Sequence, residues 1–155
     1  MLSTNMETLI DMSATAAHHM QIESAGHALR EPAERQKLSA PAVRLFLSVA
    51  DLWDLKVDDR RAILGDISAA TYHNWRRGNV ATLTRDQLER ISLVLGILKG
   101  LRLVFASDDT AFRWLKSTNS DFEFSGLSPL EVMIRGGIPD LYAVRRYLDA
   151  WRGQR

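Results

Sequence analysis

Residues 60–83 read RRAILGDISAATYHNWRRGNVATL and predict two short helices joined by a tight turn. The first predicted helix, residues 60–64, ends at Gly65, and the second, residues 68–77, ends before Gly78. Glycine is favoured just past a helix because the chain there often adopts a positive φ. A tight turn followed by a basic, polar second helix is the layout of a helix-turn-helix DNA reader.

The second predicted helix has an apolar and a polar side. Tyr72 and Trp75 are three residues apart and share one face, where they would pack with Ile63 and Ile67. Arginine can read guanine, asparagine can read adenine, and either can hold a phosphate. We therefore predict that the DNA-binding residues are Ser68 (also a good N-cap), Thr71, His73, Asn74, Arg76 and Arg77. The alternative is an ordinary surface helix with a solvated basic end.

The composition is that of a globular protein, with 46% hydrophobic and 25% charged residues among 155. The chain has no cysteine, which excludes a disulfide scaffold, a thiolate zinc site and a cysteine nucleophile. No basic start followed by an apolar run marks a secretory signal at the N-terminus. We therefore expect a cytoplasmic protein.

The net charge of +1 does not by itself indicate a nucleic-acid partner, but its distribution does. Residues 1–55 carry four basic and seven acidic side chains, whereas residues 56–102 carry nine and five. Residues 103–155 carry seven of each. The positive excess thus lies on the predicted helix-turn-helix segment, where an electrostatic footprint for DNA is needed.

Residues 1–38 are predicted to form a flexible N-terminal arm. Their adjacent histidines, His18 and His19, would not share a helical face, so no metal site is expected. Order is predicted to begin at Ser39, with Pro41 in the first turn of a helix over residues 42–54.

A long helix is predicted over residues 85–105, started by a capping box of Thr84 and Gln87. It is not expected to span a membrane, because two basic residues interrupt its apolar run. Gly96 and Gly100 are four residues apart and predict a shallow groove where another helix crosses closely. The wide apolar surface also suits a dimer seam, so residues 39–104 are predicted to bind DNA and to dimerise.

Residues 105–155 are predicted to form a second small helical unit, so the whole chain is expected to be all-α. Asp108 is the predicted cap of a helix over residues 108–117, and a loop over 118–127 follows with Phe122 and Phe124 pointing inward. Ser128-Pro-Leu-Glu131 predicts a capped short helix that ends at Gly136-Gly137. Pro139 is predicted to open a final helix that ends at Gly153 and buries Leu141, Val144, Leu148 and Trp151.

The second unit resembles the toxin-binding domain of the Xre/MbcA/ParS antitoxin family. In that family a phenylalanine precedes an acidic cap, a W-L pair, an asparagine loop and a P-L-E or P-L-D helix start. The matching residues here are Phe105, Trp114, Leu115, Asn119, Pro129, Leu130 and Glu131. Residues 45–103 likewise resemble the Xre-like helix-turn-helix domain that precedes it. One departure is the sequence DFEF at 121–124, which replaces a more usual Gly-rich stretch.

The resemblance implies an antitoxin of a type II toxin–antitoxin system. Members pair with a RES-domain toxin that consumes NAD, or with a related ADP-ribosylating toxin, and block its active site sterically. The complex represses its own operon, and we expect a homodimer within it. The final helix and tail are usually presented to the toxin, which here implies Tyr147, Trp151, Arg152, Gln154 and Arg155. The two aromatic residues in this set also fit a core role.

No enzyme motif is present. The sequence has no Gly-rich phosphate loop, no metal-ligand spacing and no nucleophile motif, so no catalytic residue, metal or cofactor is expected. A stand-alone helix-turn-helix repressor with a C-terminal dimerisation or ligand domain is the alternative function. A third possibility is an adaptor that acts only through protein contacts.

Overall fold

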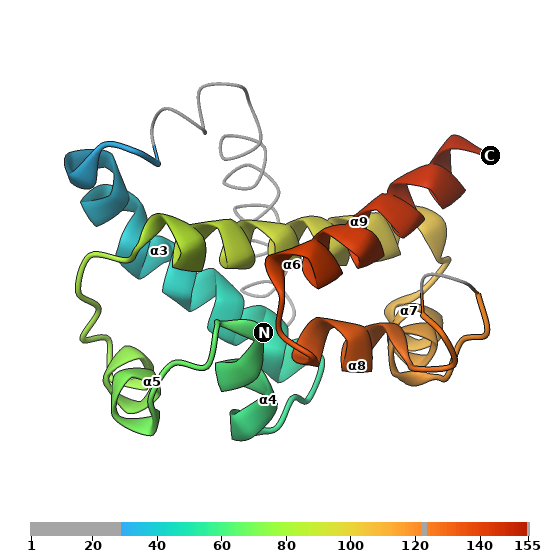
Figure 1. Ribbon diagram of the computed structural model, residues 1–155, viewed down its shortest axis with the longest axis horizontal. Coiled ribbons are helices and arrows are strands. Elements are labelled where there is room, and N and C mark those ends of the chain that lie inside the picture. The colour runs from blue at the N-terminus through green and yellow to red at the C-terminus, as the bar shows by residue number, and fades with distance from the viewer. Residues whose placement is uncertain (1–28, 122–123, 155) are drawn as a thin grey trace, which may run out of the picture.

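The computed structural model describes residues 29–121 and 124–154, which form seven helices and no strand (Figure 1). This confirms the predicted all-α class. The helices are α3 (Pro32–Leu52), α4 (Val57–Ile63), α5 (Ala69–Arg76), α6 (Arg85–Val104), α7 (Asp108–Lys116), α8 (Pro129–Ile134) and α9 (Ile138–Gly153).

Helix α6 is the central element and packs against both α3 and α9 (Figure 1). Its start is fixed as predicted: Thr84 Oγ1 accepts a hydrogen bond from the Gln87 amide, and the Thr84 amide donates to Gln87 Oε1. Eleven of its 20 residues are buried, because helices cover it on more than one side. None of the helices in the described part of the chain is long and apolar enough to cross a membrane.

Helix α9 crosses α6 at the two glycines, as predicted. A Cβ atom added at Gly100 would lie 3.2 Å from Leu148 Cβ, and one added at Gly96 would lie 2.2 Å from the Arg145 guanidinium. The glycines therefore let the two helices approach closely. The alternative use of this apolar surface as a dimer seam stays a prediction.

The predicted start of the first helix is wrong, since α3 begins at Pro32 and contains Pro41. Ser39 Oγ accepts a hydrogen bond from the Leu83 amide at 2.9 Å and donates to the Arg35 carbonyl at 2.6 Å. Arg35 Nε donates to the Leu83 carbonyl at 3.2 Å. These contacts with the segment before α6 hold the early turns of α3, so residues 32–38 of the predicted arm are helical instead. The prediction for residues 1–28, with His18 and His19, lies outside the described residues.

The C-terminal helices begin largely as predicted. Ser128 and Glu131 form the expected capping box at α8. The predicted cap of α7 is wrong by one residue: the Ser107 hydroxyl accepts from the Thr110 amide. Asp108 instead forms a two-point ion pair with Arg102, with N···O distances of 2.9 and 2.7 Å.

Arg90 of α6 ties the first half of the chain to the second. Its guanidinium donates to the carbonyl oxygens of Gly136, at 2.6 Å, and Ile63, at 3.3 Å, while its Nε donates to Asp86. Ile63 ends α4 and Gly136 follows α8, and both helices leave unpaired carbonyls at this end. One cation, with a side chain 11% exposed, therefore binds two helix ends from different parts of the chain.

Candidate nucleic-acid and protein interfaces

Helices α4 and α5 form the predicted pair joined by a tight turn. The turn uses positive φ at Gly65 (87°) and Asp66 (60°), and Ser68 Oγ caps α5 by accepting from the Thr71 amide at 3.0 Å. Helix α4 begins at Val57, three residues earlier than predicted. The four residues predicted to pack the pair together are all buried, namely Ile63, Ile67, Tyr72 and Trp75.

Arg60 is a buried residue of the α4–α5 pair. The charge count of residues 56–102 included it in the positive excess that was assigned to a DNA-binding surface. Its Nε donates to the Leu55 carbonyl, and its Nη1 donates to Asp51 at 2.7 Å and to the Tyr72 hydroxyl at 3.2 Å. Burial alone would lower the pKa of Arg60, but the hydrogen bonds to Asp51 and Tyr72 outweigh it and raise the pKa above its ordinary value. The charged side chain thus fixes α5 against the end of α3.

The predicted DNA-binding residues lie on and just before α5. His73, Asn74, Arg76 and Arg77 are exposed, and Thr71 is half-buried. The exposed Ser68 hydroxyl is already engaged, because it caps α5 and also donates to Thr71 Oγ1. The structure therefore leaves the histidine, the asparagine and the two arginines accessible on one short helix and its end.

Ion pairs reduce the positive footprint inferred from the charge count. Five of the nine basic residues between 56 and 102 form ion pairs, namely Arg60, Arg61, Arg76, Arg90 and Arg102. Arg76 lies 3.7 Å from Asp51, whereas Arg77 makes no ion pair with any described residue. Arg77 is thus the less restrained of the two arginines at the end of α5.

We expect Arg77→Ala to weaken operator binding and to leave the fold intact, because the side chain is exposed. A lost base contact should cost about 1–3 kcal/mol of binding free energy, whereas a lost phosphate contact should instead flatten the salt dependence. A mobility-shift titration of the upstream DNA at several salt concentrations distinguishes the two. Unchanged binding by the double Arg76→Ala, Arg77→Ala variant would show that α5 is not the reader.

Five aromatic rings from four separate segments form a cluster at the other end of the molecule. Trp114 is its centre: its ring centroid lies 5.6–5.9 Å from those of the other four, and it stacks on Tyr147 at an interplanar angle of 17°. The other three are Phe105, Phe124 and Trp151. Phe124 is buried, as predicted, while the other four rings are half-buried. The second inward candidate, Phe122, lies outside the described residues.

Asn119 shapes the loop that brings Phe124 to this cluster. Its side-chain oxygen accepts from the Asp121 amide at 2.9 Å, and its backbone pairs with Gly126 and Leu127. Asp121 in turn accepts a hydrogen bond from the Tyr147 hydroxyl. The asparagine of the family pattern therefore closes the loop against α9.

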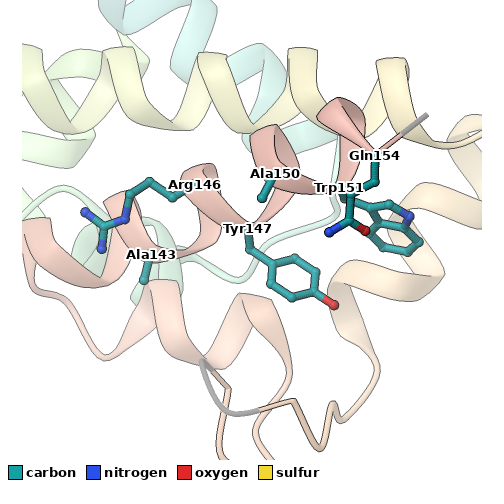
Figure 2. A pocket seen from close by; sticks show the side chains of 6 residues that line it. All are labelled: Ala143, Arg146, Tyr147, Ala150, Trp151 and Gln154. Atoms are coloured by element: carbon teal, nitrogen blue, oxygen red, sulfur yellow. The ribbon is translucent and has the colours of Figure 1, made fainter.

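A groove of about 510 Å³ runs along the outer side of α9 (Figure 2). Its described lining consists of Ala143, Arg146, Tyr147, Ala150, Trp151 and Gln154. Three of the predicted toxin-binding residues thus line one groove, Arg152 is exposed beside it, and Arg155 lies outside the described residues. Ala143, Arg146 and Ala150 were not predicted to belong to this surface, although Ala143 and Ala150 lie four and three residues from Tyr147, a spacing that places them on its face.

Within the described part of the chain, no group of three or more His, Cys, Asp or Glu side chains could hold a metal ion. Helix α5, whose polar side is exposed, and the C-terminal end of α9 lie at opposite ends of the molecule (Figure 1). The class is a protein with a helix-turn-helix pair followed by a small helical unit that carries a groove on α9.

Comparison with known proteins gives the family. Residues 31–96 match the antitoxin Xre-like helix-turn-helix domain, and residues 100–153 match the antitoxin Xre/MbcA/ParS C-terminal toxin-binding domain. The chain is also 37% identical over 131 residues to an uncharacterized protein, y4oB, of Sinorhizobium fredii (strain NBRC 101917 / NGR234); the match covers 81% of this chain and 99% of the relative. The chain belongs to the Xre/MbcA/ParS antitoxin family, which is not enzymatic. It is an antitoxin with a helix-turn-helix domain and a toxin-binding domain.

Proposed function

We propose that this antitoxin neutralises a RES-domain, NAD-consuming toxin by covering its active-site cleft, and that the complex represses its own operon. The observation that carries the proposal is the separation of the two surfaces. Helix α5 and the C-terminal end of α9 lie at opposite ends of the molecule (Figure 1). One chain can therefore contact operator DNA and a toxin at the same time.

Inhibition is proposed to be steric. Arg152 and Gln154 are exposed and follow the half-buried Trp151, so they can reach into a partner without disturbing the core. A guanidinium is planar and pairs with sites that recognise phosphate or carboxylate groups. The end of α9 thus suits a cleft that binds an anionic dinucleotide.

Repression is proposed to use a homodimer of the antitoxin within the complex. Two copies of α5 would then meet successive major-groove segments of the operator, as in other dimeric helix-turn-helix proteins. Operator DNA that binds the chain tightly only together with the toxin would support repression by the complex. Tight binding by a chain that has no toxin partner would instead favour the stand-alone repressor.

Deletion of residues 152–155 is expected to reduce protection from the toxin, partly or wholly, and to leave a folded chain that still binds the operator. The deleted residues follow the last core position, and terminal segments with few contacts tolerate removal. Growth and cellular NAD are measured during co-expression of the toxin with either the full or the truncated chain. Full protection at unchanged NAD would move the inhibitory surface away from the tail.

A further inference from the structure

Helix α9 has one face packed into the core and a second face that lines the groove. The inner face buries Leu141, Val144 and Leu148, the last of these against Gly100 of α6. The outer face carries the groove, whose lining residues recur every three or four positions and so form one stripe (Figure 2). Such a stripe is the kind of surface on which a second helix packs.

The shape of the groove favours close approach by a helix. Ala143 and Ala150 are seven residues apart, about two helical turns, and their short side chains leave room between the larger neighbours. On one side Tyr147 is stacked on Trp114, and its hydroxyl is held by Asp121. This wall is therefore ordered before any partner arrives, which reduces the entropy lost on binding.

The charged side chain in the described lining of the groove is Arg146. Arg146 is exposed and forms no ion pair within residues 29–121 and 124–154. The nearby acids are engaged elsewhere, because Asp149 lies 3.6 Å from Arg145 and Asp121 binds Tyr147. A partner that carries a carboxylate at this position would complement the groove and form a charge-assisted hydrogen bond.

We propose that the α9 groove seats an amphipathic helix of the toxin, with an apolar side chain over the two alanines and a carboxylate paired with Arg146. This inference rests on the proposed function and adds the chemistry of the partner segment. Nucleic acid is a poorer occupant, since it needs several cations along its backbone and the described lining of the groove offers one.

The test uses the RES-domain toxin that the proposed function expects as the partner, and compares its binding to the wild-type chain and to four variants of the full chain. Arg146→Glu reverses the charge, Arg146→Lys keeps it, and Ala150→Trp fills the groove. The matched control is Arg113→Glu on α7, which also reverses an exposed arginine. We expect Arg146→Glu and Ala150→Trp to weaken binding at least about tenfold, and Arg146→Lys and Arg113→Glu to change it less than about threefold.

The outcomes separate the two proposals. A wild-type chain that does not bind this protein would refute the proposed function, and the groove assignment with it. Wild-type binding that Arg146→Glu and Ala150→Trp leave unchanged would overturn the groove alone. Size-exclusion chromatography is run without the toxin. If Ala150→Trp converts a wild-type dimer into monomers there, the groove is an interface between antitoxin copies, and the toxin-helix assignment is wrong.

Discussion

Replacing Trp75 with alanine is expected to lower the free energy of unfolding by about 3–5 kcal/mol, the usual range for truncating a buried tryptophan. Its side chain is only 4% exposed and belongs to the buried hydrophobic core. The loss leaves a cavity that a short helix cannot fill by local rearrangement. Urea or thermal unfolding measures the effect, and operator binding should fall with it because α5 would lose its anchor.

His73→Ala is the matched control, since His73 lies two residues away on the same helix and is exposed. Its effect on unfolding should stay within about 0.5 kcal/mol. If Trp75→Ala unfolded at the wild-type midpoint, the register of α5 would be wrong. The set of residues assigned to face DNA would then be wrong as well.

Replacing Arg90 with methionine should lower the free energy of unfolding by roughly 2–4 kcal/mol. Methionine keeps most of the apolar stem but leaves the carbonyl oxygens of Ile63 and Gly136 without their donor, and an unsatisfied buried acceptor costs about 1–3 kcal/mol. The change should also loosen the contact between α4 and α8, which hydrogen exchange of their backbone amides can report.

Asp86→Asn is the control that removes the surface ion pair of Arg90 but keeps its hydrogen bonds to the carbonyl oxygens of Ile63 and Gly136. Asp86 is 54% exposed, and exposed ion pairs contribute about 0–1 kcal/mol. The asparagine variant should therefore unfold almost like the wild type. Equal destabilisation by the two substitutions would mean that Arg90 does not join the two halves of the chain.

The polar side of α5 could be predicted from the sequence more fully than the groove on α9. Helix α5 could be placed from the sequence because Tyr72 and Trp75 mark its buried side, which leaves its polar residues outside. The groove on α9 was not predicted from the sequence, although the family resemblance had assigned three of its lining residues, Tyr147, Trp151 and Gln154, to toxin binding. Its alanines carry no chemical signal of their own, and Arg146 gains significance only because the neighbouring acids are engaged by other residues.

Features of the fold that depend on residues close together in the chain could be predicted from the sequence. Helix starts at Thr84 and Ser128 follow from side chains that bond backbone amides three positions on. The turn at Gly65 follows from a backbone conformation that glycine adopts without strain. The periodic apolar stripes likewise place α6 and α9, because spacing along a helix fixes which side chains share a face.

Features that depend on residues far apart in the chain become apparent only in the folded molecule. The start of α3 relies on a hydrogen bond between Ser39 and Leu83, 44 positions apart, and the position of α4 beside α8 relies on Arg90 reaching Gly136, 46 positions away. Arg60 looks like a surface cation until the fold surrounds it with Asp51 and Tyr72. The aromatic cluster joins four segments, so its form cannot be read from any one of them. Local patterns set the helices, whereas long-range hydrogen bonds and packing decided how they meet and which side chains stay exposed.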